Sequence, residues 1–201
     1  MLTLIVLSAC GSTSGDKEKS SSTTSSASAS PSGSSGGASS ATYFTNAESD
    51  AINAVARPAQ AAATRATAAG NERRCNKLAS KSYPAWRTCW HGLLDPYAQK
   101  LKAIGGEFRI LQVGTFPSAC VAALKGADGV FQGFAQRVGG LLAGIDSPKR
   151  SAQVKALNSY TRTIRAVEAG YQKPFNSVTE VCYSPQQLKK LRSSPTPSPG
   201  S

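Results

Sequence analysis

The sequence predicts an all-α protein, an antiparallel up-down-up-down four-helix bundle with two disulfides and a short extra C-terminal helical piece. Apolar residues recur at spacings of three and four across residues 46–174, and no segment has a convincing strand pattern. Short connections separate four such amphipathic stretches, and helices joined in this way fold most simply as antiparallel neighbours. Four cysteines, an even number, lie between residues 75 and 182.

The first helix is predicted to begin near residue 46. Thr45 and Glu48 have the spacing of a capping box, in which the two side chains bind free amides at a helix start. The inner face of this helix is nearly all alanine. Pro58 should bend it without ending it, and Gly70-Asn71 marks its expected end or a break.

The second helix carries the clearest helical signal in the chain. It is predicted to start between Ser82 and Pro84, because proline is tolerated in a first turn. His91 projects outside its apolar stripe, so we expect a partly exposed histidine with no chemical role. The stripe runs through Pro96 without losing register, which favours a kink, and consists of Trp86, Trp90, Leu93, Tyr97, Leu101, Ile104, Phe108 and Leu111.

The third helix is predicted to open near residues 115–118 and to close at Gly144. The turn Asp146-Ser147-Pro148 then starts a fourth helix. Pro174 should break or bend this helix and leave a short helical piece over residues 175–192. The inward residues are Val121, Leu124, Val130, Phe131, Phe134, Val138, Leu141 and Leu142 on the third helix and Leu157, Tyr160, Ile164, Val167 and Tyr171 on the fourth.

The folded domain is expected to span residues 42–192. Residues 11–40 contain 14 Ser, 5 Gly and 3 Thr, a composition that cannot build a core, and they are predicted to be a disordered tether. The remaining stretch of about 150 residues is enough for one domain. Residues 193–201, which are rich in Pro and Ser, are predicted to be a disordered tail.

The first ten residues end in Leu7-Ser8-Ala9-Cys10, and the Ser/Gly-rich segment follows at once. This resembles the lipobox of bacterial lipoprotein signal peptides, in which Leu, a small residue, and Ala or Gly precede Cys. The resemblance implies cleavage before Cys10, a diacylglyceryl thioether on its sulfur, and retention on the outer face of the cytoplasmic membrane. Residues 1–9 would then be the signal peptide and residues 10–41 the lipidated tether. The composition is similar in style to that of lipoproteins from high-GC Gram-positive bacteria.

The apolar stretch of this signal is short. Leu2 to Leu7 is only six residues, and no charged residue precedes it, whereas secretory signals have a positive start and an apolar stretch of about 7 to 15 residues. We therefore expect the true translation start to lie upstream, in a segment that carries Lys or Arg.

The four cysteines of the domain favour disulfides over a metal site. Cys75, Cys89, Cys120 and Cys182 include no Cys-x-x-Cys pair, which disfavours zinc, and an oxidising envelope favours two disulfides. In the predicted bundle Cys75 and Cys89 flank one connection, and Cys120 and Cys182 meet at the opposite end. We therefore predict Cys75 with Cys89 and Cys120 with Cys182. A Cys89 nucleophile activated by His91 is disfavoured, because residues two apart on a helix point about 200° apart.

The net charge of +12 indicates an anionic partner. Outside residues 11–40 there are 21 basic and 9 acidic side chains, so the charge belongs to the domain. The sequence contains no phosphate-binding loop, zinc-protease motif or nucleophile elbow, and we expect no catalytic residues, cofactor or metal.

Two classes of function remain. The first is a tethered binding or scaffolding module of the cell envelope, whose partner is anionic wall polymer, lipid headgroups or an acidic envelope protein. The second is an envelope enzyme of unfamiliar type, or an accessory subunit of a wall enzyme or transporter. The expected location disfavours nucleic acid as a partner.

A basic stripe on the fourth helix is the first candidate contact. Lys155, Arg162 and Lys173 project within about 20° of one another, with Arg165 alongside, opposite the apolar face. Such a stripe is commonly an ordinary solvated face. The functional interpretation is a contact for anionic wall or lipid groups.

A strip of glycines on the third helix is the second candidate. Its members project within about 60° of one another and are costly in a helix. In one interpretation they let the alanine-rich first helix approach closely. In the other, Gly126, Gly129 and Gly133 floor a groove for an acyl chain or partner helix. The whole strip is Gly126, Gly129, Gly133, Gly140 and Gly144, and the border of the groove would be Phe131, Phe134 and Arg137.

Overall fold

The computed structural model describes residues 42–193, and within this range the chain is helical, with no strand. The prediction of an all-α protein is thus confirmed for these residues. The expected signal segment 1–9, Cys10 with the tether to residue 41, and all but the first residue of the expected tail lie outside the described range. The helices are α1 (Asn46–Thr67), α2 (Ala69–Leu78), α3 (Tyr83–Leu111), α4 (Ser118–Asp146), α5 (Arg150–Gly170), α6 (Gln172–Cys182) and α7 (Pro185–Ser193).

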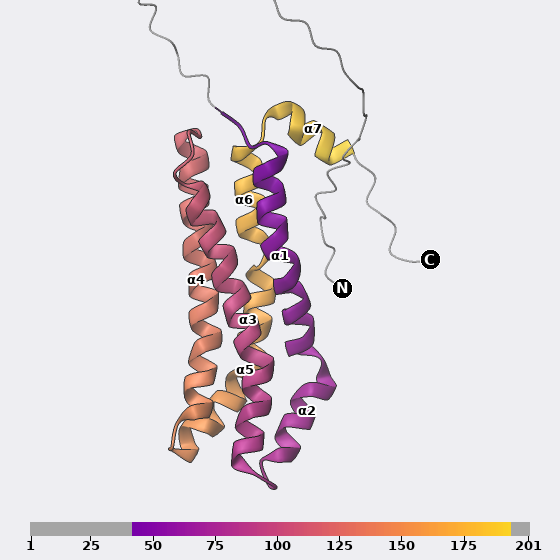
Figure 1. Cartoon of the computed structure of the whole chain (residues 1–201), viewed down its shortest axis with the longest axis vertical. Helices are drawn as coiled ribbons and strands as arrows, with labels where there is room; N and C mark the ends of the chain where they lie inside the picture. The colour runs from indigo at the N-terminus through magenta and orange to yellow at the C-terminus, as the bar shows by residue number, and fades with distance from the viewer. Residues whose placement is uncertain (1–41, 194–201) are drawn as a thin grey trace, which may run out of the picture.

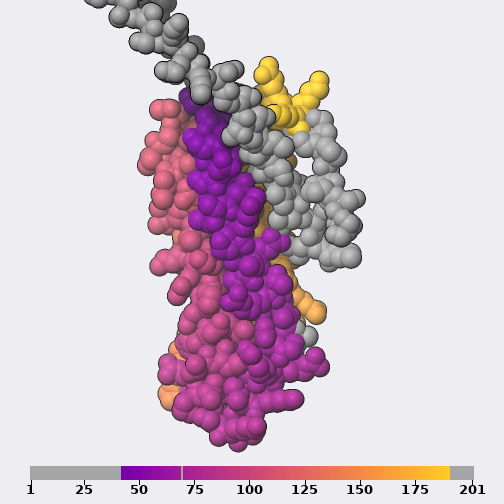
Figure 2. All heavy atoms as spheres, turned by 45° about the vertical axis from the view of Figure 1, so that its right-hand side comes forward, coloured from indigo at the N-terminus to yellow at the C-terminus, as the bar shows by residue number. Residues whose placement is uncertain are grey.

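The helices lie side by side along the long axis of the molecule (Figure 1). α3 packs along α4 and also against α1, while α5 and α6 pack against α4. α7 lies across the end at which α1 begins and α6 finishes. In the space-filling view α1 and α2 form the near face of the domain (Figure 2).

The start of α1 is built as the sequence predicts. Glu48 Oε2 accepts a hydrogen bond from the backbone amide of Thr45 at 2.7 Å, and the Thr45 hydroxyl accepts one from the amide of Ala47 at 3.2 Å. The preceding residue, Phe44, is buried, and its amide donates to the carbonyl of Cys182 at 2.9 Å. The residue before α1 is therefore hydrogen-bonded to the last residue of α6, near the C-terminal end of the domain.

The first predicted helix is two helices, because it breaks at Ala68 and not at Gly70-Asn71, which lie inside α2. A helix end leaves its last carbonyl groups without intrahelical donors. Here the Tyr160 hydroxyl of α5 donates to the carbonyl of Ala66. Pro58 lies inside α1 without ending it, as predicted.

The fourth predicted helix is interrupted at Tyr171, three residues before Pro174. Proline has no amide hydrogen, so Pro174 cannot donate to the carbonyl four residues earlier, that of Gly170. The predicted interruption is confirmed, and its position follows from this missing bond. Residues 175–182 continue α6, so the separate C-terminal piece is α7 alone.

α4 runs two residues beyond Gly144, the expected end, to Asp146. Gly144 has a packing role instead. A Cβ atom at this position would lie 2.7 Å from the Cβ of Ala156 on α5, so the absence of a side chain lets the two helices approach closely.

The core follows the predicted stripe of α3, and Trp86 through Phe108 of that stripe are buried. Phe131 of α4 contacts Phe108, Tyr171 and Phe175, which joins three helices through aromatic rings. Val130, predicted to face inward, is 40% exposed, because it lies on the outer side of α4 beside Gly129.

Both predicted disulfides are present. Cys75 to Cys89 joins α2 to α3, and Cys120 to Cys182 joins α4 to α6. The two bonds lie toward opposite ends of the domain (Figure 1).

Candidate anion-binding groove

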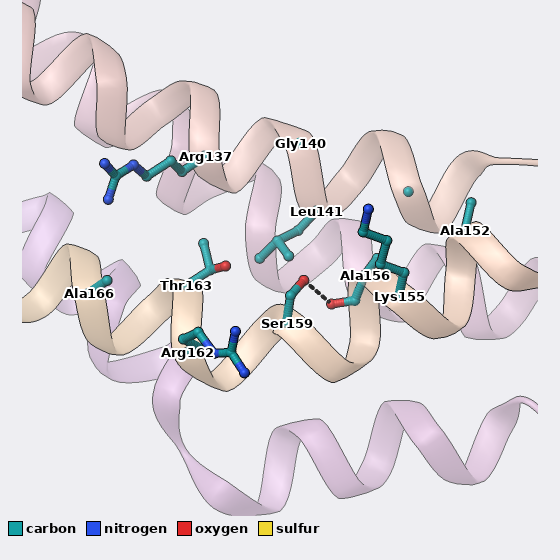
Figure 3. A pocket seen from close by; sticks show the side chains of 11 residues that line it. Arg137, Gly140, Leu141, Ala152, Lys155, Ala156, Ser159, Arg162, Thr163 and Ala166 are labelled. Atoms are coloured by element: carbon teal, nitrogen blue, oxygen red, sulfur yellow. Dashed lines mark hydrogen bonds between the residues drawn. The ribbon is translucent and has the colours of Figure 1, made fainter.

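A groove with a volume of about 470 Å³ lies between α4 and α5 (Figure 3). Three cationic side chains belong to its lining: Arg137 from α4, and Lys155 and Arg162 from α5. Lys155 and Arg162 are seven residues apart, about two helical turns, and therefore share one face of α5. All three are exposed at the edges of the groove.

The floor of the groove is small and apolar. Gly144 and Ala156, whose close approach joins the two helices, belong to it, and the Leu141 side chain points from α4 toward α5 (Figure 3). The hydroxyl groups of Ser159 and Thr163 also line the groove, and that of Ser159 donates to the carbonyl of Ala156 at 3.0 Å. The remaining lining residues are Gly140, Ala152 and Ala166.

The charges around the groove have one sign. None of its lining residues is acidic, so no carboxylate within the groove neutralises the three cations. Guanidinium and ammonium groups attract an anion. Burial of the apolar part of a ligand on the floor beside them adds to the free energy of binding. The arrangement therefore suits a ligand with a negative group and an aliphatic part.

The structure brings together only part of the predicted basic stripe. Lys155 and Arg162 line the groove. Arg165 does not, and it projects about 80° from Lys155 around the axis of α5. Lys173 lies beyond the interruption at Tyr171, in α6. Arg137, which was assigned to the glycine strip, joins the two cations of α5 instead.

The predicted groove on the glycine strip has a different surrounding. A Cβ atom at Gly126, Gly129 or Gly133 would meet nothing within 4 Å, so the first helix does not cover the strip. Phe131 and Phe134 do not border it either, because both are buried in the core. The predicted contact of the first helix with the strip is wrong, since the close neighbour at Gly144 is α5, and the predicted phenylalanine border is wrong too.

Comparison with known proteins does not indicate what the groove binds. No family model, curated protein or solved structure matches this chain. The function must therefore be inferred from the chemistry of the described residues.

Within residues 42–193 no helix is long and apolar enough to cross a membrane, and no three metal-binding side chains are grouped to hold an ion.

A second polar constellation lies where α3 begins and α4 ends. His91 Nδ1 lies 2.7 Å from Asp95 Oδ2, and its Nε2 lies 2.8 Å from Asp146 Oδ1, while Arg87 also pairs with Asp146. The hydrogen bond to Asp146 is the main cause that raises the pKa of His91 above its usual value. His91 is partly exposed, as predicted, and the structure adds two carboxylate partners that the sequence analysis did not identify.

This constellation is built to hold two helices together. Both nitrogens of His91 lie within hydrogen-bond distance of carboxylates, to which a protonated imidazole can donate on both sides, so neither nitrogen is free to take a proton from a substrate. Asp95, four residues after His91, could have been found from helical spacing. Asp146 could not, because its position depends on the packing of α4 against α3.

Proposed function

We propose that the protein is a membrane-anchored extracytoplasmic lipoprotein that acts as a binding or scaffolding module of the cell envelope. The lipobox resemblance at Leu7-Ser8-Ala9-Cys10 supports the lipid anchor on Cys10. Two disulfides support an oxidising compartment, because such bonds form and persist outside the cytoplasm.

We infer further that the scaffold is an antiparallel up-down-up-down four-helix bundle. Its four arms would be α1 with α2, α3, α4, and α5 with α6. Short connections between helices that pack along one another support this topology. The bundle would present α4 and α5, with the groove between them, as one outer face.

The α4/α5 groove is the proposed contact for an anionic partner. The observation that carries this proposal is the set of Arg137, Lys155 and Arg162 around one groove with no acidic lining residue. Anionic wall polymer, lipid headgroups and an acidic envelope protein all offer the complementary charge. Each cation near a negative surface contributes about 1 kcal/mol to binding.

The test compares two triple variants of the full chain, each with Cys10→Ser so that no lipid is attached. One carries Arg137→Gln, Lys155→Gln and Arg162→Gln. The other carries Arg57→Gln, Arg65→Gln and Lys77→Gln, which removes the same charge from exposed residues of α1 and α2, outside the groove lining.

Retention on purified cell wall and on anionic vesicles is measured for both variants as salt is raised. We expect the groove variant to lose retention and the control variant to keep most of it. High salt should release the parent protein, since exposed charges are screened. Equal losses in the two variants would mean that net charge alone drives binding, and the groove would be rejected as the site.

A further inference from the structure

The α4/α5 groove has an aliphatic floor and no aromatic side chain. Nucleobases and other planar ligands are typically held by stacking on aromatic rings, and nothing in this lining offers such a surface. Glycine, alanine and leucine instead give a smooth aliphatic surface. The apolar part of a ligand that fits this floor is an alkyl chain.

The groove has room for such a chain next to Gly140. A Cβ atom at Gly140 would meet nothing within 4 Å, and the residue is exposed. The Lys155 side chain extends across from α5 toward α4 in this region (Figure 3). An alkyl chain along the floor would therefore have a cation beside it.

The charged edges of the groove suit a phosphate group. Two of the three cations are arginines, whose planar guanidinium groups bind phosphate oxygens in pairs. Arg137 and Arg162 come from opposite sides of the groove, one from each helix. A phosphate at the edge would thus meet cations from both helices.

The size of the groove indicates where the ligand comes from. A volume of about 470 Å³ lies within the range of pockets that hold drug-sized ligands. Such ligands are smaller than a whole phospholipid. The groove is open on its outer side (Figure 3). The rest of a long acyl chain would need another apolar environment, and a bilayer provides one.

We infer that the α4/α5 groove binds the phosphate headgroup and the first methylene groups of an anionic membrane lipid. This inference rests on the proposed function, of which it names the partner. The domain would then rest its α4/α5 face on the same membrane that carries its anchor.

The first experiment fills the groove without disturbing the charges. Gly140→Leu places a side chain in the open space of the floor. Gly129→Leu is the matched control, because Gly129 is also exposed on α4 with nothing within 4 Å of its Cβ position, but does not line the groove. Both are made in the full chain with Cys10→Ser, so any contribution of the N-terminal segment is the same in each.

Binding is measured on vesicles of phosphatidylcholine with phosphatidylglycerol and on vesicles of phosphatidylcholine alone. We expect Gly140→Leu to weaken binding to the anionic vesicles about tenfold or more, and Gly129→Leu to change it by less than about twofold. Thermal unfolding of the two variants should be alike and no lower than that of the parent, since a Cβ at either position meets nothing within 4 Å and leucine favours helix over glycine. Equal vesicle binding by the two variants would overturn the inference.

The second experiment separates the headgroup from the chain with two soluble competitors of vesicle binding. Dodecyl phosphate below its micelle concentration should displace the protein at a concentration at least about tenfold lower than glycerol phosphate does. Equal potency would show that the chain adds nothing and would overturn the lipid inference, while the proposed anionic contact would stand. Equal losses in the two triple variants described above would instead reject the groove as the anionic contact, and the lipid inference with it.

Discussion

His91 of α3 holds Asp146, the last residue of α4, through its Nε2 atom, which lies 2.8 Å from Oδ1 of that carboxylate. Its Nδ1 atom is held by Asp95 one turn farther along α3, at 2.7 Å. With Arg87 on the same carboxylate, the start of α3 is fastened to the end of α4. Since the chain has one histidine, its titration can be assigned without ambiguity.

This contact predicts that stability falls as pH rises from the unfolded pKa of His91 through its raised folded pKa. The bond to Asp146, and after it the bond to Asp95, raises the pKa of His91 above 6.5, while partial burial opposes the rise. A raised pKa in the folded state contributes stability that is complete below the unfolded value and is lost as pH rises through the folded value. Asp146, whose pKa is lowered chiefly by Arg87, contributes stability that is lost as pH falls below its usual range.

The measurement is thermal unfolding of the full chain and of His91→Gln between pH 5 and pH 9. We expect the parent to lose melting temperature as pH rises through the raised pKa of His91, and the variant to show a flatter profile. Parallel profiles would contradict the role given to His91.

Two classes of glycine on α4 should respond oppositely to alanine. At Gly129 and Gly140 an added Cβ meets nothing within 4 Å, so each Gly→Ala change should stabilise the helix by about 1 kcal/mol. At Gly144 the added Cβ would lie 2.7 Å from that of Ala156, so overpacking should destabilise the domain by about 1 to 3 kcal/mol. Urea unfolding of the three variants tests this, and stabilisation by Gly144→Ala would contradict the close approach of α4 to α5.

The double change Gly129→Leu with Gly133→Leu should not lower the free energy of unfolding, and the removal of two helix glycines should raise it by about 1 to 2 kcal/mol. Neither added Cβ has a neighbour within 4 Å, so no overpacking follows. Urea unfolding against the parent protein is the measurement. A loss of about 1 to 3 kcal/mol would be the mark of a covering helix and would contradict the open strip.

The two disulfides should contribute unequally to stability. Cys120 and Cys182 are 62 residues apart, whereas Cys75 and Cys89 are 14 apart, and the unfolded chain gains more freedom when the longer loop is opened. In the chain-entropy model the losses are about 4 and about 3 kcal/mol, respectively. Urea unfolding of the two double Cys→Ser variants compares them, and an equal or reversed order would count against this explanation.

The proposed anchor predicts a defined N-terminus for the native protein. Mass spectrometry should find Cys10 as the first residue, with a diacylglyceryl group on its sulfur. In Cys10→Ser no thiol is present to carry the lipid, so at a salt concentration that screens the groove cations the variant should leave the membrane fraction while the native protein stays in it. An unmodified Met1 in the native protein would reject the lipoprotein proposal.

Much of the fold was predictable because its signals are local. The Thr45 and Glu48 cap involves atoms within three residues, and the start of α3 after Ser82 is set by the same kind of contact. The apolar stripe of α3 and the cysteine pairing were predictable for a related reason. A regular period determines which face is buried, and the order of helices along the chain determines which ends meet.

The breaks and the polar sites depended on contacts between helices. The break after α1 involves Tyr160, whose hydroxyl meets the carbonyl of Ala66 from 94 residues away. The pairing of His91 with Asp146 and the placement of Arg137 and Lys155 around one groove both depend on how α4 is rotated against its neighbours. The sequence alone determined which face of each helix is apolar and where most helices begin, because both depend on nearby residues. Only the tertiary structure decided which polar side chains share a site, because side-chain packing sets the rotation of one helix against another.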